Sequence, residues 1–186
     1  MPDSPLFIDA RQWVVDKYPY NSFHLIRAVE WLDRIGPGSD EAVRIATLTH
    51  DMERAFPGPD QPVQQSLVDH EYHAAHSARS ARIVGEWLRQ RDVAESLASE
   101  VERLVRFHED GGSPDANLIQ AADSLSFLDC NVDLFLGWVQ SGKWPAREVR
   151  MKFEYSFDRI QVPHARSLAL PMRDQALARL ALLERE

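Results

Sequence analysis

The sequence has a single cysteine, Cys130, so it can form neither an intramolecular disulfide nor a zinc site built on cysteine ligands. Any metal ion would have to be held by histidine and carboxylate side chains. No window approaches the roughly 18 uninterrupted apolar residues of a membrane-spanning helix. The first residues, MPDSPLFIDARQW, lack the basic start and long apolar run of a secretion signal. We therefore expect a cytoplasmic protein without a membrane partner.

Positive charge is also in short supply. The chain has 21 lysines and arginines against 29 aspartates and glutamates, a formal net charge of −8, and its basic residues are scattered singly. Proteins that bind a nucleic-acid backbone or an anionic membrane gather basic residues into a patch or stripe. The composition therefore argues against nucleic acid as a partner and favours a small substrate.

Three common catalytic patterns are missing as well. The chain has no glycine-rich phosphate loop, no HExxH zinc motif and no convincing arrangement of a serine or cysteine nucleophile. Any catalysis would have to rest on bound metal ions.

Proline and glycine divide the chain into segments with helical periodicity, and no segment alternates as a strand would. One helix is expected to start at Ser22 and stop at Gly36, and the next is capped by Ser39 or Asp40. Further helices are expected up to about residue 89, over 93–108 and 115–139, and on either side of Pro163. The sequence predicts an all-α protein, with residues 1–186 forming one domain, a bundle of roughly seven helices.

Several titratable residues fall where these helices should face the core. Burying them without partners would be costly, and a divalent cation would compensate, because imidazole and carboxylate are common ligands of iron, manganese, nickel and zinc. For each residue alone, a structural hydrogen bond is the simpler interpretation, and His108 has the alternative of a helix C-cap. Their occurrence on several different helices favours a metal site. These residues are His24, His50 with the adjacent Asp51, His108 and Asp123.

The surrounding sequences carry a family resemblance. SFHLIRAVEWLDRI contains His24, RIATLTHDMERAF contains His50 and Asp51, and LIQAADSLSFL contains Asp123. This order resembles the signature of the HD-domain superfamily of metal-dependent phosphohydrolases, which are helical bundles. The resemblance covers about residues 20–160, which leaves 161–186 as a C-terminal helical extension.

One branch of that superfamily is dinuclear and has extra histidines between the doublet and the last aspartate. HEYHAAHSARSA offers His73 and His76 here, and VERLVRFHEDG offers His108. We choose His76, because an apolar stripe continues from it along the helix; His73 stays the alternative, or a substrate-facing residue, and His70 should be solvated. The resemblance implies that Asp51 bridges two ions and that the metal ligands are His24, His50, Asp51, His76, His108 and Asp123.

A phosphoryl group would need cations beyond the metals. Arg27 lies one helical turn after His24, and Arg54 one turn after His50, so both are candidates for a catalytic role beside Asp51. Lys152 and Arg159 are weaker candidates for substrate contacts. Each of the four could instead be an ordinary solvated cation.

The functional hypothesis is an enzyme that hydrolyses a phosphate ester or anhydride of a small molecule, with a nucleotide as the favoured class. Metal-activated hydroxide would be the nucleophile, supplied by one or two ions of iron, manganese, nickel, cobalt, zinc or magnesium. Two alternatives stay open: an HD-type di-iron oxygenase, and a non-catalytic HD domain for sensing or interaction. The chain could act as a monomer or a homodimer.

Overall fold

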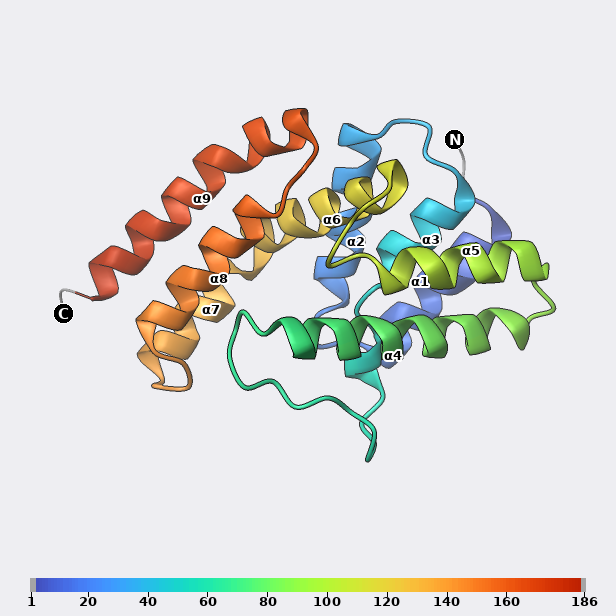
Figure 1. Ribbon diagram of the computed structural model, residues 1–186, viewed down its shortest axis with the longest axis horizontal. Coiled ribbons are helices and arrows are strands. Elements are labelled where there is room, and N and C mark those ends of the chain that lie inside the picture. Colours follow the sequence, from blue (N-terminus) through green and yellow to red (C-terminus); the bar gives the residue numbers. More distant parts are fainter. Residues whose placement is uncertain (1–2, 185–186) are drawn as a thin grey trace.

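The structure is a computed structural model that describes residues 3–184, and every regular element in that range is helical (Figure 1). The prediction of an all-α bundle is confirmed. No helix in this range is both long and apolar enough to cross a membrane. The elements are α1 (Pro5–Lys17), α2 (Ser22–Ile35), α3 (Glu41–Thr49), the 3₁₀ helix η1 (Met52–Ala55), α4 (His70–Arg89), α5 (Glu95–Arg106), α6 (Pro114–Ser126), the π turn η2 (Phe127–Asn131), α7 (Val132–Gln140), α8 (Ala146–Asp158) and α9 (Pro163–Leu183).

Side-chain caps fix the starts of several helices. A cap oxygen accepts a hydrogen bond from a backbone N–H in the first turn, which otherwise has no partner within the helix. Asp40, and not Ser39, caps α3 through Val43 N–H at 3.0 Å. The other caps of this kind are Ser4 on α1, Asp69 on α4 and Ser113 on α6.

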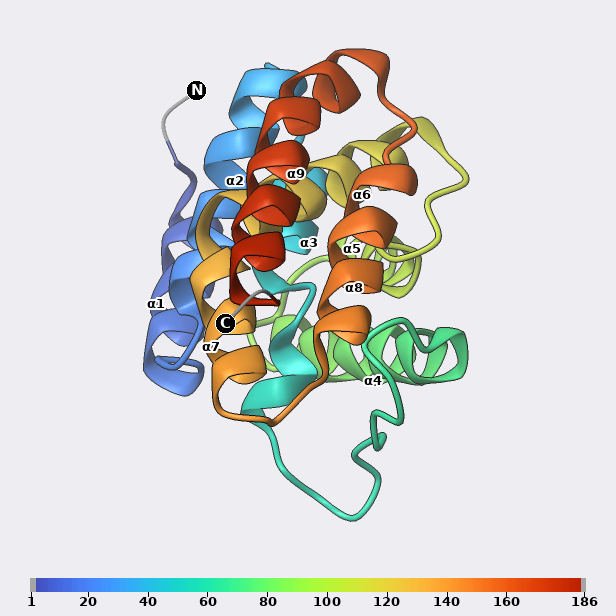
Figure 2. The ribbon, with the colours of Figure 1, turned by 90° about the vertical axis from the view of Figure 1, so that its left-hand side faces the viewer.

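The helices enclose two hydrophobic cores. The first lies among α1 to α6, and the second among α6 to α9 and the π turn. Helix α6 belongs to both, because Ile119 and Ala122 pack into the first core while Ala121 and Leu125 pack into the second. Figures 1 and 2 show α9 lying along the outside of α8 and α7, and its buried residues make it the last helix of the second core. The candidate site lies where the two cores meet.

Helices α4 and α5 form an antiparallel pair joined by a short turn (Figure 1). They pack closely at Gly85, where an added Cβ would collide with the side chain of Glu102. The small residues of α4 permit this approach, as expected from the sequence. The long connection from residue 56 to 69 leaves the bundle before α4 begins and extends away from it (Figure 2).

The single helix expected over 115–139 is instead interrupted by the π turn at residues 127–131. In a regular α-helix, residues four apart drift by about 40° around the axis at each step. A π turn takes more residues per turn and cancels this drift. Asp123, Phe127 and Asn131, which are spaced four apart along this segment, all line the same cavity.

Candidate metal centre

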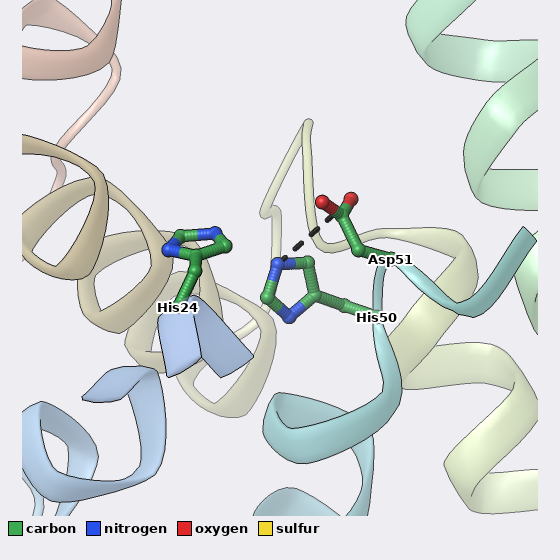
Figure 3. Close-up of side chains that lie close together, drawn as sticks. All are labelled: His24, His50 and Asp51. Carbon is green, nitrogen blue, oxygen red and sulfur yellow. Dashed lines mark ion pairs between the residues drawn. The ribbon is translucent and has the colours of Figure 1, made fainter. Parts of the chain in front are cut away.

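The His50–Asp51 doublet lies where helix α3 ends. His50 is the C-cap of α3, and Asp51 follows it with a non-helical φ of −100° before η1 begins. The chain leaves the α-helix between the two residues, so both side chains turn toward the same space as His24 on α2 (Figure 3). His50 Nε2 lies 4.0 Å from Asp51 Oδ1. The structure therefore agrees with the expectation that the doublet faces a cavity from a helix end.

Four buried histidines share one orientation. In each ring Nδ1 lies within hydrogen-bond distance of an acceptor, at 2.8 Å from Thr47 O for His50, 2.7 Å from Val105 O for His108, 3.0 Å from Glu53 Oε1 for His76 and 2.9 Å from Ser126 Oγ for His24. Ser126 Oγ donates its own hydrogen to His24 O, so it accepts from the ring. With the proton on Nδ1, each ring presents the lone pair of Nε2, which is the arrangement of a metal-binding histidine.

Two buried aspartates lie among these Nε2 atoms. Asp51 Oδ1 is 2.8 Å from His76 Nε2, and Asp123 Oδ1 is 3.1 Å from His24 Nε2 and 3.4 Å from His50 Nε2. Among residues 3–184, three groups have ligand atoms that all lie within 4.8 Å of one another. They are His24, His50 and Asp51; His50, His108 and Asp123; and Asp51, His76 and His108. The six residues expected as ligands thus meet at one place, and they could hold a metal ion.

The Nε2 atoms of His50 and His108 provide the test of fit. Both are fully buried and lack a hydrogen-bond partner within the described chain. A buried polar atom without a partner is costly, and a metal ion bound to Nε2 removes that cost. The donor set of imidazoles and carboxylates suits a divalent transition ion.

The charges around the centre favour a bound cation. Burial acts against protonation of His50, but Asp123 and Asp51 outweigh it and raise its pKa to about 9. The same two carboxylates would stabilise a dication in place of that proton. Burial lowers the pKa of His108 to about 3, with His50 and His76 adding to the effect, so His108 stays neutral with a free lone pair.

Arg54 and Arg159 hold the two aspartates in their charged form. Burial alone would raise the pKa of Asp51, but the Arg54 guanidinium, 3.2 Å away, together with His76 and His50 keeps it well below its usual value. Arg159 does the same for Asp123. Arg159 also pairs with Glu109 and donates from Nε to Ser124 Oγ at 2.8 Å. Its donors are therefore engaged, which makes Arg159 a support for the carboxylates.

Lys152 is a cation of a different kind. It lines the same cavity, with Nζ 5.4 Å from the ring centre of Tyr155 and 5.5 Å from that of Phe127. It has neither an ion-pair nor a hydrogen-bond partner in the described part of the chain, and burial lowers its pKa. Lys152 is thus available to a ligand, whereas Arg159 is not.

Arg27, expected as a catalytic residue, does not reach the cavity. Its guanidinium pairs with Glu30 at 2.6 Å and with Asp129 at 2.7 Å on the outer face of α2. Residues three apart on a helix are neighbours, so the Glu30 pair forms locally. Helical spacing placed Arg27 near His24, but these two carboxylates hold its side chain outside the cavity.

The structure distinguishes His73 from His76, as the helical register suggested. His76 belongs to one of the candidate metal groups, whereas His73 belongs to none of them. His73 is buried beside them, with Nδ1 3.4 Å from Tyr155 OH and 3.9 Å from Glu109 Oε2. Burial lowers its pKa to about 4. His70 is exposed, as expected.

Two buried glutamates of the site were missed in the sequence. Glu109 has its Oε1 3.7 Å from His108 Nε2, and Glu53 bonds to the far side of His76. Glu109 directly follows a candidate ligand, and Glu53 is the second residue after Asp51. Adjacency to the ligands was the one signal that could have identified them.

The cavity around the centre is lined by two further kinds of side chain besides its histidine and carboxylates. The cationic side chains are Arg54, Lys152 and Arg159. The aromatic lining, which also includes amide and aliphatic side chains, comprises Tyr18, Tyr20, Asn21, Phe127, Asn131, Leu134, Phe135 and Trp138. The cavity thus presents cationic groups that attract an anion together with flat or apolar surfaces.

Fold and site together define an all-helical protein with a buried histidine and aspartate centre that could hold metal. The family model described as "Domain of unknown function (DUF4202)" matches residues 8–178, so the chain belongs to that family. No curated protein and no solved structure matches the chain. The family description names no activity.

Proposed function

We propose that this protein is a metal-dependent phosphohydrolase that cleaves a phosphate ester or anhydride of a small molecule, with a nucleotide as the leading class. One observation carries the proposal: four buried imidazoles turn Nε2 toward two aspartates, beside a lysine that has no hydrogen-bond or ion-pair partner within residues 3–184. The resemblance of these residues to the HD-domain signature supports the same activity.

The three ligand groups suit two ions. His24, His50, Asp51 and Asp123 would hold the first ion, and His76 and His108 the second, with Asp51 shared. Four imidazoles favour iron, manganese, nickel, cobalt or zinc over magnesium, which prefers oxygen ligands. When bound, such ions supply Lewis acidity, which lowers the pKa of water and draws charge from a phosphate oxygen.

The protein side chains would then bind and orient the substrate. Lys152 and the exposed Arg54 would neutralise phosphate oxygens that point away from the ligands. Arg159 would keep Asp123 and Glu109 charged and in place. The aromatic lining with Asn21 and Asn131 would receive the remainder of the molecule, where a nucleobase would stack and hydrogen-bond.

One observation favours a second candidate, an oxygenase with a di-iron centre. An imidazole-rich donor set suits iron, and Lys152 lines the cavity with Tyr155 beside it and beside His73, where they could bind an oxidisable substrate. A non-catalytic role in sensing has no such feature in its favour, because the full ligand set is present.

The deciding experiment is a measurement of metal identity and stoichiometry by elemental mass spectrometry, on untagged protein prepared without chelator or added metal. The same sample is then assayed for phosphate release from a panel of nucleotides and other phosphate esters, and for oxygen consumption. About two ions per chain with phosphate release would support the phosphohydrolase. Iron with oxygen uptake and no phosphate release would favour the oxygenase, and a metal-free protein that takes up no ion would overturn both.

A further inference from the structure

Glu53 is the most deeply buried carboxylate close to the centre, with 1% of its surface exposed. It lies in η1, directly after the doublet, where its backbone N–H donates to Ser80 Oγ on α4 at 3.1 Å. Its Oε1 accepts from His76 Nδ1 at 3.0 Å, while the opposite nitrogen of that ring faces Asp51. Glu53 therefore touches His76 from behind and does not face the space where the ligand atoms meet.

Only His76 among the four candidate histidine ligands has a carboxylate behind it. The other three rings donate to neutral acceptors, the carbonyls of Thr47 and Val105 and the hydroxyl of Ser126. A carboxylate behind a metal-bound imidazole fixes the ring and makes it a stronger ligand than a neutral acceptor does. This difference between His76 and the other three histidines does not depend on which reaction the centre would catalyse.

Glu53 is itself fixed from its other side. Arg79 Nη1 donates to Glu53 Oε2 at 3.2 Å and to Glu53 O at 3.0 Å, and Arg79 Nη2 donates to Asp60 Oδ1 at 2.9 Å. A buried carboxylate needs such a partner to remain charged. A series of side-chain contacts thus connects Asp60, in the connection between residues 56 and 69, to the centre. It passes through Arg79, Glu53, His76 and Asp51.

We propose that Glu53 is a positioning residue that selectively strengthens the metal position formed by Asp51, His76 and His108. The inference rests on the proposed metal centre, and not on the proposed hydrolysis. In the position formed by His24, His50 and Asp123, neither histidine has a carboxylate behind it, because Ser126 Oγ behind His24 and Thr47 O behind His50 are uncharged. The two positions should therefore differ in their dependence on the residues behind their ligands.

The test is the rate of zinc release to a chromophoric chelator, measured on the full chain loaded with two zinc ions. Loss of a carboxylate behind a ligand weakens metal binding by about 10–100-fold. In Glu53→Gln, which keeps the shape and a hydrogen-bond acceptor, one ion should leave faster by that factor while the other leaves as in the wild type. Circular dichroism and the melting temperature at excess zinc verify that the variant is folded.

Two further variants assign the ion that is released. His76→Ala should already lack the affected ion, so adding Glu53→Gln to it should leave release of the remaining ion unchanged. Ser126→Ala is the mirror control, since it removes the acceptor behind His24 and should loosen the other ion. Faster release of the remaining ion in the His76→Ala, Glu53→Gln double variant would mean a general structural role and would overturn the inference.

The outcomes separate this inference from the proposed function. A wild type that binds two zinc ions, with a folded Glu53→Gln variant that releases both at wild-type rates, overturns the role of Glu53 alone. A wild type that binds no zinc overturns the metal centre, and the phosphohydrolase proposal with it. Selective release in a protein without phosphatase activity would support Glu53 and count against the proposed reaction.

Discussion

Asp51 Oδ1 lies 2.8 Å from His76 Nε2, so the second residue beyond α3 meets the second turn of α4 at the centre. Asp51 belongs to two of the three candidate ligand groups, as do His50 and His108, and it is the carboxylate common to the two proposed ion positions. The nearly isosteric Asp51→Asn variant should therefore lose both ions and all activity. Elemental mass spectrometry on the folded variant measures the loss. Retention of one full ion per chain would contradict the bridging role.

Removal of metal should lower thermal stability. An ion that binds only the native state adds about 2.7 kcal/mol at a free concentration 100 times its Kd, which corresponds to about 5–10 °C in a chain of this length. The melting temperature should fall when the protein is dialysed against chelator and recover when metal returns. The Asp51→Asn variant is the control, and it should not respond to chelator. An unchanged wild-type melting curve would argue against ligation by the buried side chains.

Loss of Arg159 should destabilise the protein far more than loss of Arg27. Arg159→Ala leaves Asp123 and Glu109 buried without their cation, which typically costs about 3–5 kcal/mol. Arg27→Ala breaks only pairs near the surface, which are worth about 1 kcal/mol or less. Urea unfolding of both variants gives the comparison. Equal effects would show that Arg159 does not compensate the two carboxylates.

Lys152 should contribute to substrate binding without affecting the metal. A hydrogen bond to a charged group is worth about 1.5–3 kcal/mol, so Lys152→Met should reduce kcat/KM for a phosphorylated substrate by roughly 10–100-fold. Metal content should stay at the wild-type value, because Lys152 makes no hydrogen bond or ion pair with a candidate ligand within the described residues. Lys143→Met, at an exposed lysine whose Nζ lies over the Trp138 ring, is the matched control and should retain activity. Loss of metal from the Lys152 variant would instead indicate a structural role.

His73 should make the protein less stable in acid. Its pKa is lowered by burial to about 4 in the folded protein, against an ordinary value of 6.5, so the unfolded chain binds this proton more readily. The folded state therefore loses stability as the pH falls from about 6.5 toward 4. His73→Gln should lack this pH-dependent loss of stability. The unfolding free energy of the wild type should therefore fall relative to that of the variant as the pH is lowered from about 6.5 toward 4. His70→Gln, at an exposed position of the same helix, should leave the wild-type pH dependence intact.

The parts of the site that could be predicted from the sequence are those indicated by patterns within a single helix. The His50–Asp51 doublet is visible as two polar residues ending an apolar helix, and the register of α4 was enough to prefer His76 to His73. The helices could be predicted from periodicity and caps. The π turn could not, because its effect on register depends on packing between the two cores. No spacing of residues in the sequence indicated this turn.

The residues that were misplaced or missed depend on contacts between distant elements. Glu109 follows the end of α5, and Arg159 from the end of α8 pairs with it beside the centre. Glu53 pairs with Arg79 on α4, whereas its neighbour Arg54 pairs with Asp51. Arg27 lies one helical turn after His24, which is the spacing expected for a residue of the site. Its long side chain instead pairs with Asp129, about 100 residues further along the chain, and stays outside the cavity.

The π turn joins α6 and α7, and the residues before and after it have different roles in the site. Asp123 comes before the turn and faces the candidate ligands, whereas Asn131 closes the turn and belongs to the aromatic lining of the same cavity. Deletion of one residue between them would restore regular α geometry and rotate everything beyond it, while leaving Asp123 in place. A change in this one turn would thus alter the aromatic lining without moving the residues that could hold a metal ion.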